Sequence, residues 1–508
     1  MSANRSRKAA QNVTAGFLYE LVNLVCGLIL PRLILQSFGS AYNGLTSSIS
    51  QFISVIALMK SGIGGVTRAA LYKPLAEHDD HAISEILMST ERYMRRIALI
   101  FILGVTVFAA IYPLWIVKDF EWFFSFSLVM IISISTFMQY YFGLTYQMLL
   151  NADQKGYVSS FVQIITTILN TVIASVLILC GASIHVVKLG SALAFAVNPI
   201  LINRYAYKHY NIDRTVKPNM SRISQRWDAL GHEVANFINN NTDIMVLTVF
   251  IGVKEVSVYT VYTYVIHAIR KVVVNFTTSF GAAFGNMYAK QEFDLMHENL
   301  GIFELMVFSI TSIVYSVTLV MITPFSVLYT HGVHDISYYR PIFGYVIVLA
   351  SAFTCYRIPY YMIVTSAGHY KQTRNGAFME AIINIALSIA MVIKLGLVGV
   401  AIGTLAAAIF RSTQYAIYMG KNILVRPIRM YLLHVFVSLG TMAATFGVGS
   451  LFFKQVDTIP IWIVKAVILT LFAGGITVGV DLLLWREDCK NLMRKGKGIF
   501  RKRKKKTT

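Results

Sequence analysis

Charged residues are scarce in this chain: they make up 14% of its 508 residues, where a soluble protein carries about 25%. Apolar residues make up 56% of the sequence. A membrane-spanning helix needs about 20 mostly apolar residues, and apolar runs of that length follow one another along nearly the whole chain. The scarcity of charge therefore excludes a soluble protein with a large core and predicts an all-α polytopic membrane protein.

Several functional signatures are also missing. There is no G-x-x-x-x-G-K-[ST] loop, which excludes this way of binding ATP. The four cysteines form neither a CxxC metal pattern nor a disulfide framework. The apolar segment after residues 1–12 runs on without an A-x-A-like cleavage site, so we expect no signal peptide. No loop is long enough for a soluble catalytic domain. We therefore expect neither an enzyme nor a cofactor.

The net charge of +21 is unevenly distributed. Basic residues concentrate in alternate loops and in the tail, RKGKGIFRKRKKKTT, while the opposite loops carry few. This is the positive-inside pattern, which places both termini in the cytoplasm, and it favours attraction of the tail to anionic lipids over binding of nucleic acid.

Apolar runs predict fourteen spans: 13–37, 42–66, 93–113, 121–149, 157–180, 185–204, 227–251, 255–286, 299–323, 340–366, 374–395, 398–419, 430–452 and 460–484. They predict a cytoplasmic N-terminus (1–12), an N-lobe of helices 1–6 (13–204), a cytoplasmic linker (205–226), a C-lobe of helices 7–12 (227–419), helices 13–14 (430–484) and a basic cytoplasmic tail (485–508).

An internal repeat supports two lobes. Residues 213 positions apart match in type: Glu20 with Glu233, Asn23 with Asn236, Gly39 with Gly252, Glu91 with Glu304, and Gly190 with Gly403. The matches indicate a repeat of six helices. An even number of helices makes the halves parallel, a known transporter design.

Residues 227–286 hold groups that lipid rejects. Two predicted spans there carry Glu233, Asn236, Asn239, Asn240, Asn241 and Asp243, and then His267, Arg270, Lys271 and Asn275. A charge near the bilayer centre costs about 2.5–3.5 kcal/mol on insertion scales, so such residues face a bundle interior or a watery cavity. We therefore expect the two halves to face each other across a polar cleft.

Basic side chains within the spans are candidates for binding an anionic substrate. The candidates are Arg32, Lys60, His267, Arg270 and Arg357. Arginine offers a planar donor fork suited to phosphate oxygens. Arg270 lies near mid-helix, one turn after His267, which favours a cavity; Lys271 points about 100° away around the helix. The alternative is that each cation pairs with a carboxylate, or, for Lys60, snorkels to the interface.

Acidic side chains within the spans are candidates for coupling transport to an ion gradient. The candidates are Glu20, Glu233, Asp243, Glu380 and Asn384. Glu380 and Asn384 are spaced i, i+4 and share one helix face, so with Asp243 they predict a site for Na⁺ or a proton. The alternative, interhelical hydrogen bonding that holds the bundle together, stays open.

The N-terminal region carries three motifs. The polar first helix ends in Pro31-Arg32, a Gly-x-x-Tyr-x-Gly-Leu turn follows at 39–45, and a Gly-Ile-Gly run with Arg68 closes the second helix. These features resemble the start of the polysaccharide transport (PST) family of Wzx-type flippases. That family belongs to the multidrug/oligosaccharidyl-lipid/polysaccharide (MOP) exporter superfamily, with the lipid II flippases and the multidrug antiporters (MATE).

The resemblance implies two six-helix lobes around an alternately open cavity. It implies passage of an undecaprenyl-pyrophosphate-linked oligosaccharide across the bacterial cytoplasmic membrane, with a polysaccharide polymerase and glycosyltransferases as partners. By helix position, Arg32, Lys60 and Arg270 match the basic cavity of lipid II flippases, and Asp243, Glu380 and Asn384 match their cation site. The alternative function is a small-molecule cation antiporter, against which several cavity cations argue.

Overall fold

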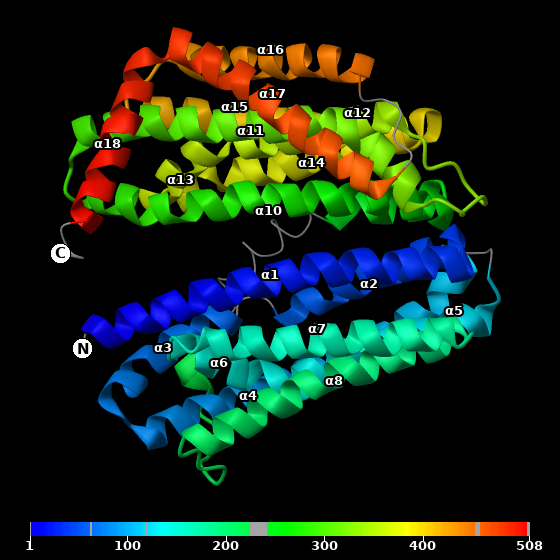
Figure 1. Ribbon diagram of the computed structural model, residues 1–508. Coiled ribbons are helices and arrows are strands. Elements are labelled where there is room, and N and C mark those ends of the chain that lie inside the picture. The colour runs from blue at the N-terminus through cyan, green and yellow to red at the C-terminus, as the bar shows by residue number, and fades with distance from the viewer. Residues whose placement is uncertain (1, 61–62, 117–119, 224–240, 453–457, 505–508) are drawn as a thin grey trace. The chain divides into compact units, whose positions relative to one another are not determined.

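The computed structural model describes residues 2–60, 63–116, 120–223, 241–452 and 458–504, and within these ranges the chain is helical with no β-strand. It divides into two compact units, Met1–Ser257 and Val258–Thr508, whose helices are labelled in Figure 1. Eleven helices in the described part are long and apolar enough to cross a membrane. The predicted all-α polytopic architecture is therefore confirmed.

The first unit is built around helices that run alongside one another. Helix α7 packs against both α1 and α8, and α4 packs against α5 (Figure 1). The helices are α1 (Ser2–Phe38), α2 (Ser40–Ile56), α3 (Ile63–Glu77), α4 (Asp80–Trp115), α5 (Trp122–Met138), α6 (Leu144–Ala152), α7 (Gly156–Leu179) and α8 (Ile184–His209). Shorter pieces are the 3₁₀ helices Ala57–Lys60 and Met220–Ile223, the π-helical turn Gln139–Gly143 and the apolar helix Asn241–Phe250.

In the second unit, α11 packs against α12, α16 and α17. A second tight pair is α14 with α15, and α15 also packs on α12. The helices are α10 (Val253–Ala289), α11 (Phe293–Tyr329), α12 (Pro341–Tyr356), α13 (Ile358–Ser366), α14 (Tyr370–Leu395), α15 (Leu397–Asn422), α16 (Ile428–Phe452), α17 (Ile459–Leu484) and α18 (Arg486–Lys504).

Three of the predicted spans are not among the eleven apolar helices, and a different cause explains each omission. The span 42–66 is interrupted after Lys60, where residues 61–62 lie outside the described chain. The span 227–251 is described only from residue 241. The span 255–286 lies within α10, a helix of 37 residues whose polar side chains lower its hydropathy. The assignment of residues 227–251 to the second lobe stays a prediction.

The predicted loop 67–92 is largely helical. Helix α3 continues to Glu77, and α4 begins at Asp80, well before the predicted span at 93. Asp79 caps α4, because its side chain accepts a hydrogen bond from the amide of Ala82 at 2.9 Å. Charged residues lower the hydropathy of this stretch without preventing a helix, so the predicted span marks only its apolar part.

Within the first unit, α2 packs tightly against the first residues of α10. Asn43 Nδ2 donates to Ser257 Oγ of α10 at 2.8 Å, and Thr248 Oγ1, in the preceding helix Asn241–Phe250, donates to Ser48 Oγ at 2.9 Å. A Cβ on Gly44 would lie 1.7 Å from the carbonyl oxygen of Val253. Glycine is required here because only its bare Cα lets the two backbones approach so closely.

Substituting alanine for Gly44 should therefore separate α2 from the start of α10. We expect Gly44→Ala to cost about 1–3 kcal/mol, the usual cost of overpacking, and to lower the midpoint of thermal unfolding in detergent. Gly65→Ala is the matched control, because nothing lies within 4 Å of a Cβ at Gly65. Equal unfolding midpoints for the two variants would contradict the close contact.

Candidate functional site

Arg357 lies where one predicted span breaks into α12 and α13. It ends α12 and caps α13, two residues before Pro359. Proline lacks a backbone N–H and clashes with the preceding turn, so a continuous helix is not favoured here. The break places the Arg357 side chain toward α14.

A carboxylate on α14 holds two arginines. Arg357 Nη1 lies 2.9 Å from Glu380 Oε1, and Arg411 Nε, on α15, lies 3.4 Å from Glu380 Oε2. Arg411 is buried; it also donates to Tyr415 OH at 2.6 Å and to the Thr373 carbonyl at 3.1 Å. The residues predicted for substrate binding (Arg357) and for ion coupling (Glu380) thus form one ion-paired group.

One turn further along α14, Asn384 faces a cluster of uncharged oxygens. Ser388 Oγ lies 3.2 Å and Thr404 Oγ1 lies 3.5 Å from Asn384 Oδ1. Thr404 Oγ1 also donates to the Val400 carbonyl at 3.1 Å. Asn384 is buried, so α14 and α15 offer amide, hydroxyl and carbonyl oxygens at one place. Oxygen ligands of this kind suit hard cations.

Glycines allow this close packing of α14 on α15. A Cβ on Gly403 would lie 2.4 Å from Ser388 Oγ and 2.9 Å from the Asn384 carbonyl oxygen, and one on Gly399 would lie 2.5 Å from the Met391 carbonyl. Small residues let helices in a membrane approach each other in this way. Gly399 and Gly403 therefore set the distance between α14 and α15 at the oxygen cluster.

The other predicted coupling residues belong to the first unit. Asp243 is buried in the short helix Asn241–Phe250, and Glu20 is half-buried on α1. Glu233 lies outside the described residues. The described contacts therefore bring Glu380 and Asn384 together on α14, while the predicted roles of Asp243, Glu20 and Glu233 stay predictions.

The remaining predicted cations lie on three helices. Arg32 is half-buried near the end of α1, and Lys60 is exposed at the end of a 3₁₀ helix with its ammonium 5.2 Å from the centre of the Tyr140 ring. Arg270 lies near the middle of α10 and is half-buried, one turn after the exposed His267.

The arginines within the helices fall into two groups. Arg357 and Arg411 are paired with Glu380. By contrast, Arg32 and Arg270 take part in no ion pair in the part of the chain that the structure describes. Guanidinium groups stay charged at all pH values that proteins tolerate, so both Arg32 and Arg270 can attract an anionic ligand.

Sequence reasoning assigned no role to one further charged group. Glu304, fully buried on α11, forms an ion pair with Arg426 from the segment between α15 and α16. His434 Nε2 on α16 lies 3.8 Å from the same carboxylate. An acidic residue amid apolar ones on α11 was the available signal, but its partner is 122 residues away. The pairing could not be read from spacing.

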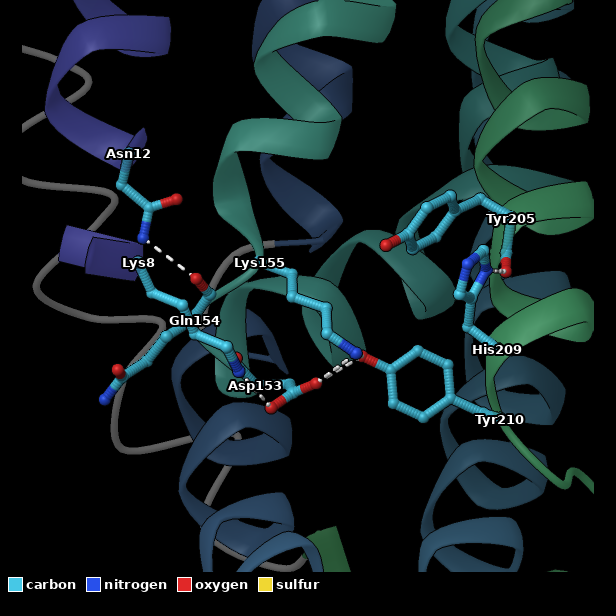
Figure 2. A network of polar contacts seen from close by, with 8 residues as sticks. All are labelled: Lys8, Asn12, Asp153, Gln154, Lys155, Tyr205, His209 and Tyr210. Carbon is cyan, nitrogen blue, oxygen red and sulfur yellow. Dashed lines mark hydrogen bonds and ion pairs between the residues drawn. The ribbon is translucent and has the colours of Figure 1, made fainter. Parts of the chain in front are cut away.

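A second polar network fixes the start of α1 to the turn between α6 and α7 (Figure 2). Lys8 Nζ lies 3.2 Å and Lys155 Nζ lies 2.8 Å from the carboxylate of Asp153, and Tyr210 OH donates to it at 2.7 Å. Asn12 Nδ2 donates to the Gln154 carbonyl at 3.0 Å. The Asp153 carboxylate therefore joins α1, the start of α7 and the end of α8. The Asn12 hydrogen bond adds a second link between α1 and the turn.

The charges around Asp153 lower its pKa below the usual 3.8. Burial by itself would raise this pKa, but the hydrogen bonds from Lys155 and Tyr210 and the charges of Lys155 and Lys8 outweigh it. The pKa of Tyr210 is raised, first by burial and then by its hydrogen bond to Asp153. Asp153 is therefore ionised and Tyr210 is neutral at physiological pH.

Comparison with known proteins places this architecture among membrane transporters. No protein-family model and no curated protein matches the chain in sequence. Among solved structures, a lipid II flippase (MurJ, inward closed conformation) is similar at a TM-score of 0.68 and 15% identity, covering 93% of this chain and 98% of its own.

Multidrug transporters are similar over a smaller share of this chain. An inward-facing MATE family transporter of the MOP superfamily matches at a TM-score of 0.63 and 15% identity, covering 81% of this chain and 98% of its own. The Vibrio cholerae MATE transporter VcmN in the bent form matches at 0.52 and 15% identity, covering 84% and 99%. The chain has the fold of these transporters and is a multi-pass membrane protein.

The Asp153 network makes a prediction that depends on pH. Its carboxylate has a lowered pKa, so its stabilising effect is complete above about pH 3.8 and is lost as the pH falls through the folded-state value. Partial exposure limits the effect to about 1 kcal/mol. At neutral pH, Asp153→Asn should speed hydrogen exchange of the amides around Lys8–Asn12 about fivefold.

An exposed carboxylate provides the control for this measurement. Asp294, in the first turn of α11, is exposed and belongs to the second unit. Asp294→Asn makes the same change of charge and should leave exchange in α1 unchanged. Exchange in α1 that is insensitive to Asp153→Asn would show that the network does not hold this helix.

Proposed function

We propose that the protein is a flippase that moves a polyprenyl-pyrophosphate-linked oligosaccharide, the repeat unit of a polysaccharide, from the inner to the outer leaflet of the bacterial cytoplasmic membrane. It acts as a transporter and not as an enzyme. The observation that carries the proposal is the pair of half-buried arginines, Arg32 and Arg270, which have no carboxylate partner among the described residues, whereas Arg357, Arg411 and Arg426 are paired.

The chemistry of such a substrate explains why unpaired arginines are useful. The pyrophosphate is the group that cannot cross lipid unaided, because removing a charge from water is costly. Guanidinium groups in a wet cleft replace its hydration with charge-assisted hydrogen bonds. The polyprenyl tail remains in the bilayer throughout. Rocking of two lobes, as in transporters built from repeats, then alternates access to the two leaflets.

The extent of the structural similarity also favours a flippase. The lipid II flippase covers 93% of this chain, while the two MATE transporters cover 81% and 84%. A small-molecule antiporter is the second candidate, and the MATE similarity supports it. Arg32, Arg270 and the exposed Lys60 are cations and would repel a cationic drug, so we prefer the anionic substrate.

We place the coupling ion at the oxygen cluster of α14 and α15. Asn384, Thr404 and the Val400 carbonyl supply neutral oxygen ligands there, and Asp243, which is buried in the first unit, stays a separate candidate for the coupling ion. Glu380 is shared by Arg357 and Arg411, so its role there is to position α14. Na⁺ or a proton moving down its gradient through this site would supply the energy for uphill transport.

The proposed orientation follows from the charge pattern. The proposed partners follow from the proposed glycan substrate. Basic residues in alternate loops place both termini in the cytoplasm, and the basic tail after residue 485 attracts anionic lipids. The glycan substrate would be supplied by glycosyltransferases on the cytoplasmic side and consumed by a polysaccharide polymerase on the outer side.

Removing one guanidinium tests the substrate assignment. A hydrogen bond to a charged group contributes about 1.5–3 kcal/mol, so Arg270→Ala should weaken substrate binding about tenfold or more. Arg270→Lys should recover only part of the activity, because lysine lacks the bidentate fork. The measurement is the amount of lipid-linked glycan that reaches the outer leaflet, in cells or proteoliposomes, at equal protein level.

The neighbouring lysine is the control for charge. Lys271 lies about 100° around the helix from Arg270, so Lys271→Ala should leave flipping close to the unmodified level. Full activity in an Arg32→Ala/Arg270→Ala double variant would rule out pyrophosphate binding by these arginines.

Separate variants test the coupling ion. Asp243→Asn and Asn384→Ala should reduce the response of transport to an imposed Na⁺ or proton gradient while the protein level stays the same. Glu380→Gln should differ, because it leaves the buried Arg411 unpaired and so lowers stability by about 3 kcal/mol. A normal gradient response in both Asp243→Asn and Asn384→Ala would make these residues structural.

A further inference from the structure

Helices α11, α16 and α17 enclose a small polar cavity in the second unit. Its volume is about 10 Å³, enough for one water-sized sphere. Six oxygen-bearing side chains line it, two from each helix: Ser309 and Ser312, Ser438 and Thr441, and Thr477 and Asp481. A patch of hydroxyls around a carboxylate is unusual between helices that are otherwise strongly apolar.

The carboxylate in this cavity has no positive partner. Asp481 is 8% exposed and accepts a hydrogen bond from Ser309 Oγ at 2.5 Å. No lysine, arginine or histidine of the described chain forms an ion pair with it. A buried carboxylate within a membrane helix must gain a proton or a cation, because an isolated charge there is too costly.

A second observation at the cavity points to a ligand. Thr477 is 2% exposed, lines the cavity, and its hydroxyl has no hydrogen-bond partner. It lies one turn before Asp481 on α17, so both side chains share one helix face. Buried polar groups are nearly always satisfied. An unsatisfied hydroxyl beside an unpaired carboxylate therefore requires a third group between them.

The other oxygens are arranged to accept a cation. Ser438 Oγ shares a hydrogen bond with Ser312 Oγ and another, at 2.6 Å, with Tyr356 OH. Thr441 Oγ1 donates to the Ser438 carbonyl at 2.8 Å, which leaves its lone pairs free. Hydroxyl and carboxylate oxygens are the ligands of hard cations. A single carboxylate balances a single positive charge, which favours a monovalent cation over a divalent one.

The neighbouring carboxylate is already paired, whereas His434, which lines the cavity, keeps one ring nitrogen, Nδ1, without a hydrogen-bond partner. Glu304 pairs with Arg426, and His434 Nε2 lies 3.8 Å from Glu304. The His434 ring also lines the cavity and stacks on Trp485, with ring centres 4.3 Å apart. Asp481 is thus the carboxylate that remains available at this cavity.

We propose that the cavity between α11, α16 and α17 binds a sodium ion, held by Asp481 and the hydroxyls of Ser309 and Thr477. Because α16 and α17 lie outside the predicted six-helix repeat, the ion would fasten these two helices to α11. This site uses different helices from the oxygen cluster of α14 and α15, and it does not depend on the identity of the transported substrate.

Sodium binding can be measured on the full-length purified chain in lipid nanodiscs without any substrate. The background variant Asp243→Asn/Asn384→Ala removes the proposed coupling site. In this background we expect saturable binding of radioactive sodium, and a higher unfolding temperature in NaCl than in KCl or choline chloride at equal ionic strength. Asp481→Asn should abolish both effects, and Thr477→Val should lower the sodium affinity about tenfold or more.

A threonine on the same helix provides the control. Thr470 is exposed and its hydroxyl donates to the Ala466 carbonyl at 2.7 Å, so Thr470→Val should leave sodium affinity unchanged. If Asp481→Asn does not fold, Thr477→Val decides the question. Unchanged sodium affinity in Thr477→Val, or stabilisation by acid alone and not by sodium, would overturn the proposal; the second result would assign a proton to Asp481.

Discussion

The cost of placing charge in hydrocarbon governs how this protein is built. A charge at the bilayer centre is expensive unless it is paired or solvated, and the long helices of this chain carry several. Several of them are paired inside the second unit: Glu380 with both Arg357 and Arg411, and Glu304 with Arg426. These pairs cross-link α11, α13, α14 and α15 with the segment after α15.

Charges that have no partner among the described residues are exceptions to this pairing, and each suggests a ligand of opposite charge. Arg32 and Arg270 are positive and half-buried, which suits an anionic substrate; Asp481 is negative and enclosed by hydroxyls, which suits a small cation. The uncharged oxygens at Asn384 and Thr404 form a separate cluster. The same physical rule therefore underlies the proposed anion-binding function and the two proposed cation sites, which lie on different helices.

Apolar runs predicted the helical membrane architecture well, because hydropathy reports the free energy of moving side chains from water into lipid. They marked only the apolar part of α4, where charged residues extend the helix beyond the predicted span. Ion-pair partners could not be predicted. Arg357 and Glu380 were assigned to separate roles, and nothing in a spacing of 23 residues across a helix break reveals that they meet. The cavity at Asp481 depends on side chains from three helices, so no single segment discloses it.

The most direct test of the central claim is equilibrium binding of polyprenyl lipids to the purified protein. Three ligands with the same tail should be compared: the pyrophosphate, the monophosphate and the free alcohol. If unpaired arginines recognise the headgroup, affinity should fall in that order, and an Arg32→Ala/Arg270→Ala variant should lose the preference while still binding the tail. Equal affinity of the unmodified protein for the pyrophosphate and the alcohol would contradict the account.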